Sequence, residues 1–306
     1  MNKKIIIGAR GSKLSLAYVE KVKKLLKDIY RSDNLKIKVK KIKTSGDLFS
    51  KESISKLGGK NNFCKEIEEQ LEKKKIDIAI HSLKDMETIQ NDNLTVASYL
   101  KRNDPKDVLI LNKNYSVDID SSFKIGTSSP RREYQIKNIY KKIITKEIRG
   151  NIDSRIKKIS TGRYDGIMIA AAGVLALGLE KKISKIFSVN EVIPCGGQGI
   201  IALQCRKKDF YIKMLLSKLN DTESEICAKA EKKFLETIGG DCHTAVGVFA
   251  EVHGEKLKII SQLFSDDGKH YFTNEKVGKI SSPENLGKIA GEETLIKFKK
   301  HFKKKK

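Results

Sequence analysis

The feature that most constrains the fold is the alternation of short apolar segments with amphipathic ones in the first 80 residues. Lys4–Gly8 is typical of a buried strand, and Leu14–Tyr30 carries apolar residues at helical spacing. A second strand is predicted over residues 37–41, a second helix over Phe63–Lys74 and a third strand over Ile76–Ile80. The order strand, helix, strand, helix, strand predicts a mostly parallel sheet covered by helices.

The same alternation begins again after Arg102-Asn103-Asp104-Pro105, which we interpret as a crossover between two similar α/β lobes. In the second lobe we predict strands at Val108–Leu111, Lys124–Gly126, Ile143–Glu147 and Gly166–Ala170, with helices that begin near Pro130 and Ile152. Past Asp221 the order changes: a helix at Thr222–Leu235, strands around Val246–Val252 and Leu257–Leu263, and a closing helix from Pro283. This order predicts an α+β third domain.

The net charge of +24 indicates an anionic partner. The division of the basic residues between Lys and Arg indicates what kind of partner it is. Of the 62 basic residues 53 are Lys and nine are Arg, so the positions of the few Arg carry more information than the total. No run approaches the roughly 18 apolar residues of a membrane span, and the apolar run at the N-terminus is too short for a signal peptide, so we expect a cytoplasmic protein. Five Cys without C-x-x-C spacing indicate free, mostly buried thiols.

Five of the nine Arg fall in three turns that each follow a predicted strand, where ligands bind in open α/β sheets. The turns are Arg10-Gly11-Ser12, Gly126-Thr127-Ser128-Ser129-Pro130-Arg131-Arg132, and the segment from Glu147 to Arg155 that includes Arg149. In the second turn Ser129 is a candidate N-cap and Pro130 a first helical residue. Guanidinium groups that converge on one cleft suit a ligand with several carboxylates or phosphates. Gly58-Gly59-Lys60 lacks the rest of a P-loop, so we interpret it as a mobile turn that carries a lysine.

Asp85 and Cys242 are the two candidates for chemistry. Asp85 follows the third predicted strand, where it could stabilise a developing cation and pass protons, or form a structural salt bridge to one of the Arg. Cys242 lies in a glycine-rich loop beside His243, and it could be a nucleophile, a covalent anchor or an inert thiol. Without a second Cys/His pair no metal site is expected. His81 is interpreted as a satisfied strand-end histidine.

These motifs, in this order, resemble the porphobilinogen deaminase (hydroxymethylbilane synthase) family over nearly the whole chain. The resemblance is carried by Ile7-Gly8-Ala9-Arg10-Gly11-Ser12, Gly58-Gly59-Lys60, His81-Ser82-Leu83-Lys84-Asp85, Arg102-Asn103-Asp104-Pro105-Lys106-Asp107, Gly126-Thr127-Ser128-Ser129-Pro130-Arg131-Arg132, Arg149-Gly150-Asn151, Gly197-Gln198-Gly199 and the Cys242 loop. The chain departs from the family pattern at Tyr18, where Gln is common, and at Met86-Glu87, where an apolar residue and Pro are usual.

The resemblance implies two lobes like type II periplasmic binding proteins, formed by residues 1–100 with 196–218 and by residues 101–195, and a C-terminal domain of residues 219–306. It implies a cytoplasmic, monomeric transferase of porphyrin and haem biosynthesis, without nucleic acid or membrane partners. Such an enzyme joins four porphobilinogen molecules onto a covalent dipyrromethane cofactor, with loss of ammonia, and releases hydroxymethylbilane by hydrolysis.

The resemblance also implies roles for individual residues. Asp85 matches the carboxylate that stabilises the azafulvenium cation left by ammonia, and Cys242 the thioether attachment of dipyrromethane. The other implied cofactor-binding residues are Lys84, Ser128, Ser129, Arg131 and Arg132; the implied substrate-binding residues are Arg10, Ser12, Arg149, Arg155, Lys60 and Phe63. Two rivals remain open: a non-catalytic two-lobed polycarboxylate-binding protein, and a nucleic-acid-binding protein that uses the net charge.

Overall fold

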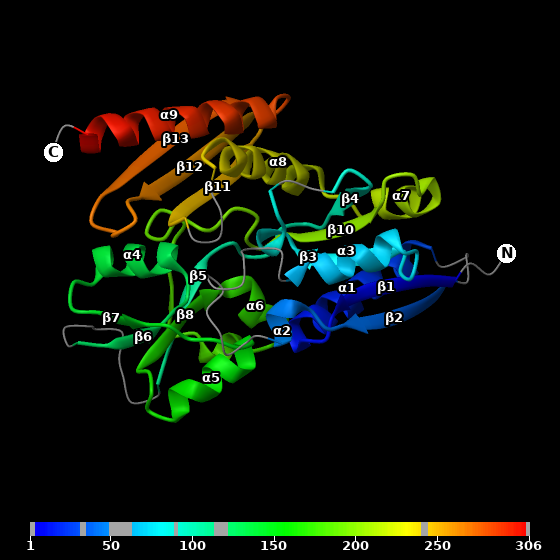
Figure 1. The fold of residues 1–306 in the computed structure, drawn as a ribbon, viewed down its shortest axis with the longest axis horizontal. Helices are drawn as coiled ribbons and strands as arrows, with labels where there is room; N and C mark the ends of the chain where they lie inside the picture. The colour runs from blue at the N-terminus through cyan, green and yellow to red at the C-terminus, as the bar shows by residue number, and fades with distance from the viewer. Residues whose placement is uncertain are drawn as a thin grey trace. The chain divides into compact units, whose positions relative to one another are not determined.

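The computed structural model describes residues 4–30, 35–48, 63–88, 91–112, 122–239 and 244–303. The chain divides into two compact units. The first contains Met1–Asn103 and Ile200–Glu225, and the second contains Asp104–Gly199 and Ile226–Lys306. Three separate sheets, one in the first unit and two in the second, organise the described residues (Figure 1).

The first unit is built on a five-stranded sheet of order β2-β1-β3-β10-β4. Its strands are β1 (Lys4–Arg10), β2 (Lys36–Ile42), β3 (Ile78–Ser82), β4 (Leu94–Tyr99) and β10 (Ile201–Arg206). β1 pairs in parallel with β2 and β3, whereas β10 runs antiparallel between β3 and β4. The helices are α1 (Lys13–Ile29), α2 (Ser45–Leu48), α3 (Lys65–Glu72) and α7 (Phe210–Ser217), with a 3-10 turn, η3, at Leu83–Asp85.

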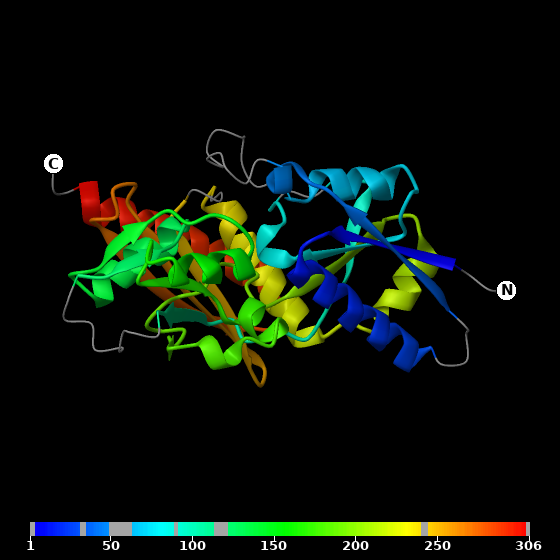
Figure 2. The same cartoon turned by 90° about the horizontal axis from the view of Figure 1, so that it is seen from below.

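Alternate residues of β1 pack on opposite faces of this sheet, as the pleat requires. Ile5 and Ile7 join the core under α1 and α7, and Ile6 packs with Ile67 and Leu71 of α3 on the other face. Figure 2 shows α1 (blue) and α7 (yellow-green) on one side of the sheet and α3 (cyan) on the other. The unit is therefore a three-layer α/β lobe.

The second unit begins with a five-stranded sheet of order β7-β6-β8-β5-β9. Its strands are β5 (Asp107–Leu111), β6 (Lys124–Gly126), β7 (Ile144–Lys146), β8 (Gly166–Ala170) and β9 (Lys185–Ile186). Helix α4 (Pro130–Ile139) packs on one face through Ile136, while α5 (Ile152–Ser160) and α6 (Ala171–Ala176) cover the other through Ile159 and Val174; a 3-10 turn, η4, spans Glu180–Lys182.

The second unit ends in a three-stranded antiparallel sheet, β11 (Val246–His253), β12 (Lys256–Phe264) and β13 (Tyr271–Lys279). Helices α8 (Thr222–Thr237) and α9 (Pro283–Lys303) contribute Phe234, Leu286 and Ala290 to the core on one face of this sheet. The division between the units falls inside α8. Ile193 packs on the other face, against Phe249 and Ile260.

The predicted fold class, two α/β lobes followed by an α+β domain, is confirmed by these three sheets. The strands and helices predicted in the two lobes and the C-terminal domain are present, with ends that shift by a few residues. Seven of the described strands and α-helices were not predicted: β4, β9, β10, β13, α2, α6 and α7. The domain boundaries stay a prediction. Within the part of the chain that the structure describes, no helix has the length and apolar character to cross a membrane.

Candidate active site

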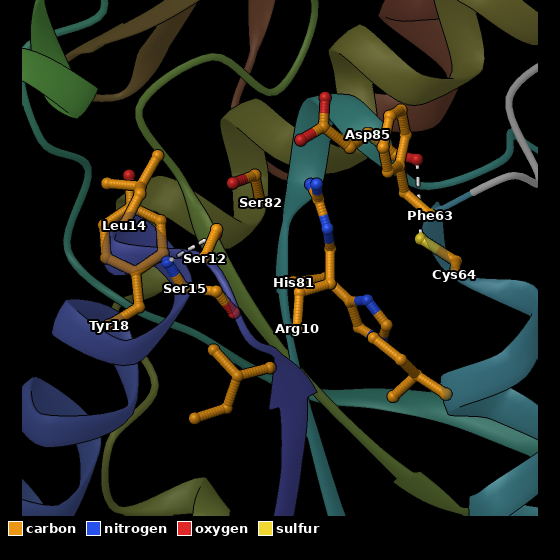
Figure 3. Close-up of a pocket in the computed structure, with 12 residues that line it drawn as sticks. Arg10, Ser12, Leu14, Ser15, Tyr18, Phe63, Cys64, His81, Ser82 and Asp85 are labelled. Carbon is orange, nitrogen blue, oxygen red and sulfur yellow. Dashed lines mark hydrogen bonds between the residues drawn. The ribbon is translucent and has the colours of Figure 1, made fainter. Parts of the chain in front are cut away.

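A cavity in the first unit lies where β1 and β3 end and α1 begins (Figure 3). Its lining combines charged, hydroxyl, aromatic and aliphatic side chains: Arg10, Ser12, Leu14, Ser15, Tyr18, Phe63, Cys64, Ile67, Ile80, His81, Ser82 and Asp85. Four residues predicted from the sequence as site residues are among them, namely Arg10, Ser12, Phe63 and Asp85. The end of parallel strands is the expected place for a ligand in such a sheet.

Ser12 fixes the start of α1 at the edge of the cavity. Its backbone is extended, with φ −68° and ψ 152°, and its hydroxyl oxygen accepts a hydrogen bond from the Ser15 N–H at 3.2 Å. This is N-capping, for which Ser is a preferred residue. Because the helix begins here, Leu14 and Tyr18, one turn apart, both face the cavity.

Arg10 is held in place by an acid that the sequence analysis missed. Its Nη2 lies 2.5 Å from Asp47 Oδ1, and its guanidinium carbon lies 4.2 Å from the centroid of the Phe63 ring. Burial would raise the pKa of Asp47, but the hydrogen bond and charge of Arg10, with hydrogen bonds from Thr44, outweigh it and lower that pKa. The pair keeps a cation oriented on an aromatic face, an arrangement that is favourable in itself.

Asp85 is the last residue of η3, and three hydrogen bonds hold this turn. The Leu83 N–H donates to Ile200 O at 3.0 Å, and the Met86 N–H donates to Leu83 O at 3.0 Å. The Cys64 thiol donates to the backbone oxygen of Asp85 at 3.4 Å. The Met86 side chain is buried beside Cys64, so the apolar residue after Asp85 fixes the turn through packing.

The carboxylate of Asp85 forms no ion pair with the described residues. Arg10, the cation that lines the same cavity, pairs with Asp47 instead. Within the first unit, Asp85 therefore forms no salt bridge to Arg10, the clustered Arg of that unit. For the four Arg of the second unit the alternative of a structural salt bridge stays open. A carboxylate held by its backbone, with its side chain facing a cavity, can respond to charge that develops on a ligand.

Burial and the charge of Asp85 both shift the pKa of three other titratable groups of the cavity. Burial, assisted by Asp85, raises the pKa of Tyr18 to about 12, and the same two causes raise the pKa of the Cys64 thiol well above its usual value. Burial lowers the pKa of His81 to about 4, although a hydrogen bond to Gln204 and the Asp85 charge oppose it. His81 Nε2 lies 3.0 Å from Gln204 Oε1, in agreement with its interpretation as a satisfied strand-end histidine.

In the second unit, Arg131 and Arg132 surround one buried carboxylate. Ser129 caps α4 by accepting from the Arg132 N–H at 3.5 Å, and Pro130 is in the first turn. Arg131 Nη1 lies 2.7 Å from Asp107 Oδ2, and Arg132 Nε lies 2.9 Å from Asp107 Oδ1. Burial opposes ionisation of Asp107, but the two guanidinium groups hold its pKa well below the usual range.

The sequence contained a signal for this acid. The positive end of a helix dipole disfavours two cations in the first turn of α4, so a compensating anion is required close by. Asp107, the first residue of β5, supplies it, and its side chain is completely buried. Two guanidinium groups on one carboxylate leave one formal positive charge, and the buried Arg131 Nε has no hydrogen-bond partner among the described residues.

The other predicted residues of the second unit organise the turn that follows β7. Ser128 Oγ accepts from the Ile148 N–H at 3.2 Å. Arg149 Nε donates to Glu147 Oε1 at 2.7 Å, and Arg155 Nε donates to Gly150 O at 2.7 Å. Arg10 lies in the first unit and the other four predicted Arg in the second, and their convergence on one cleft stays a prediction.

The sequence comparisons cover both parts of the chain. Residues 5–214 match the family model described as porphobilinogen deaminase, dipyromethane cofactor binding domain, and residues 225–295 match its C-terminal domain. A porphobilinogen deaminase of Clostridioides difficile (strain 630) is 38% identical over 285 residues, which are 92% of this chain and 94% of the relative. One from Limosilactobacillus reuteri (strain DSM 20016) is 35% identical over 302 residues, 98% of both chains. This chain belongs to the porphobilinogen deaminase family.

Similarity to solved structures is weaker. An arginine-specific periplasmic binding protein of Salmonella typhimurium matches with a TM-score of 0.40 at 10% identity. The match covers 73% of this chain and 94% of the binding protein. A zinc-bound ligand-binding component of an ABC-type import system from Staphylococcus aureus also has a TM-score of 0.40, at 17% identity, and covers 76% of this chain and 73% of its own.

Two site residues that the porphobilinogen deaminase resemblance implies, Lys60 and Cys242, lie outside the described residues. Lys84 lies on η3 beside Asp85. Cys64, Cys205 and Cys227 are buried free thiols and Cys195 is a half-buried one, which confirms the expectation for the described cysteines. Among the described His, Cys, Asp and Glu residues, no group of three or more could hold a metal ion.

Proposed function

We propose that this chain is a hydroxymethylbilane synthase that joins four porphobilinogen molecules head to tail, releases one ammonia for each, and frees the linear tetrapyrrole by hydrolysis. Family membership supports this activity. The structural observation that carries it is the Asp85 carboxylate, which faces a cavity lined by Arg10 and has no ion-pair partner among the described residues. A reaction that leaves a positive charge on its substrate is aided by such a carboxylate.

Asp85 acts on the bond that releases ammonia. The aminomethyl nitrogen of porphobilinogen leaves from its protonated, ammonium form. The C–N bond breaks, the electron pair goes to nitrogen, ammonia is released, and the pyrrole retains a delocalised positive charge. A carboxylate close to that charge lowers the energy of the transition state. After the new C–C bond forms, the attacked ring carbon loses its proton, and we assign the acceptance of that proton to Asp85.

The carboxylates of the substrate are matched by cations and hydroxyl groups. Each porphobilinogen carries an acetate and a propionate, for which guanidinium groups are the strongest partners in proteins. In the first unit Arg10 and Ser12 are assigned to this role, with Phe63 as the aromatic wall. Arg149, Arg155 and Lys60 are the further proposed substrate-binding residues.

The donor set of the second unit fits a dipyrromethane, which carries four carboxylates. The Arg131 and Arg132 cluster has one formal positive charge in excess and a buried Nε without a described partner. Ser128, Ser129, Lys84 and Asp85 complete the proposed cofactor-binding residues, and Cys242 is the proposed thioether attachment. When bound, the dipyrromethane supplies the pyrrole carbon on which the product is built.

The proposed activity is tested by adding porphobilinogen to the purified chain and measuring ammonia and the tetrapyrrole. We expect four molecules of ammonia for each hydroxymethylbilane. Saturable binding of porphobilinogen without ammonia release would instead support the rival, a non-catalytic polycarboxylate-binding protein. We further propose that the enzyme is a cytoplasmic monomer without membrane partners, as the family resemblance implies. Nucleic acid is not a proposed partner, because the positive charge beyond the Arg turns is mostly Lys.

A further inference from the structure

Tyr18 is a buried residue of the cavity whose hydroxyl group has no partner among the described residues. The side chain is 8% exposed and lines the same cavity as Arg10 and Asp85. Tyr30, which follows the last residue of the same helix, is equally buried, but its hydroxyl donates to Leu215 O at 3.0 Å. The Tyr18 hydroxyl is not among the fully buried atoms that lack a partner, so it is open to the cavity that its side chain lines. A ligand in that cavity can therefore accept its hydrogen bond in place of water.

The position of Tyr18 in the cavity indicates what kind of ligand can reach its hydroxyl group. Figure 3 shows its ring on α1 and Asp85 on the opposite side of the cavity, with Ser12 and Ser82 between them. A ligand in the cavity therefore meets a phenol on one side and a carboxylate on the other. Leu14 and Phe63 add apolar walls, which suit a planar ring.

The phenol is a donor at neutral pH. Burial and the negative charge of Asp85 raise the pKa of Tyr18 to about 12, so the O–H proton is retained. An O–H donor suits an anionic acceptor, and a hydrogen bond to an ionised group is stronger than a neutral one. Arg10, the cation of this cavity, already shares its charge with Asp47, so a substrate carboxylate needs further donors.

We propose that the Tyr18 hydroxyl donates a hydrogen bond to a carboxylate of porphobilinogen in this cavity, and so contributes to substrate binding and specificity. This inference rests on the proposed function, because it takes its ligand from that reaction. It assigns a role to a residue at which the chain departs from the family pattern.

The test compares Tyr18→Phe with Tyr30→Phe, which removes the same atom from an equally buried ring that does not line the cavity. We expect KM for porphobilinogen to rise about ten- to a hundredfold in Tyr18→Phe, with kcat within about threefold of the unmodified enzyme. Tyr30→Phe should keep both constants. In urea, Tyr30→Phe should unfold earlier because it loses a hydrogen bond, whereas Tyr18→Phe should not.

An unchanged KM in Tyr18→Phe would overturn the inference, as would a loss confined to kcat, which would indicate that the phenol acts on Asp85. Calorimetric titration with porphobilinogen, in Asp85→Asn with and without Tyr18→Phe, separates this inference from the proposed function. A tenfold or greater loss of affinity supports the role of Tyr18 even if Asp85→Asn remains active. Equal affinities refute that role even if the unmodified enzyme produces hydroxymethylbilane.

Discussion

Replacing Asp85 by Asn should lower the rate of ammonia release from porphobilinogen by about 10²- to 10⁴-fold, the range typical of a lost acid–base group. Asn has nearly the same shape but carries no charge, so it can neither stabilise the cation left by ammonia nor accept a proton. The turn that carries residue 85 is held by backbone hydrogen bonds and by the Cys64 thiol. The variant should therefore fold, with a urea midpoint close to that of the unmodified chain.

The control for this prediction is Asp92→Asn, which makes the same change at an exposed position outside the cavity. Its rate of ammonia release should equal that of the unmodified enzyme. If Asp85→Asn folds and releases ammonia at the unmodified rate, the chemistry assigned to Asp85 is wrong, whatever residue replaces it in that role.

Replacing Asp107 by Ala should lower the free energy of unfolding by about 3–5 kcal/mol, the cost expected when one partner of a buried ion pair is removed. Asp107 is completely buried and contacts both Arg131 and Arg132, whose side chains are almost completely buried. Without it, two guanidinium groups remain in the interior at the N-terminus of α4, where the helix dipole also disfavours them. The urea midpoint measures this loss.

Asp266→Ala is the matched control, because Asp266 is exposed and its described hydrogen bond uses the backbone oxygen. Its effect on the free energy of unfolding should stay within about 0.5 kcal/mol.

The stabilisation by Asp107 should also depend on pH. Its pKa is lower in the folded chain than its ordinary value of 3.8, so the contribution is complete above that value and is lost as the pH falls below it. A loss below about 1 kcal/mol in Asp107→Ala at pH 7 would contradict the account of this cluster.

The local pattern of apolar residues predicted those strands and helices whose apolar residues pack into the core. The apolar run of β1 and the helical stripe of α1 are visible in the sequence, and both elements formed as predicted. β13 was missed because it is exposed over most of its length, with Asn274 as its one buried residue. The residues of β10 are mostly apolar and buried, as in a core strand, but its place between β3 and β4 was not predicted. The chain reaches that place only after it has passed through the second sheet, and such a return leaves no local signal.

Candidate site residues were easier to predict than their partners. Strand ends and residue types indicated Arg10, Asp85 and the Arg131 turn, and the first two line the same cavity. The acids that bind these Arg, Asp47 and Asp107, are 24 to 37 residues away in sequence, and only the fold brings them close. The hydroxyl of Tyr18 is likewise seen to lack a described partner only in three dimensions.

The central claim, that the chain builds its product on a dipyrromethane attached to Cys242, is tested most directly by intact mass. The unmodified chain and Cys242→Ser are expressed in a host that makes porphobilinogen, and both purified proteins are weighed by mass spectrometry under denaturing conditions. The account predicts that the unmodified chain exceeds its sequence mass by two condensed porphobilinogen units, and that Cys242→Ser has its sequence mass alone. An unmodified chain at its sequence mass, or the same excess in Cys242→Ser, would contradict it.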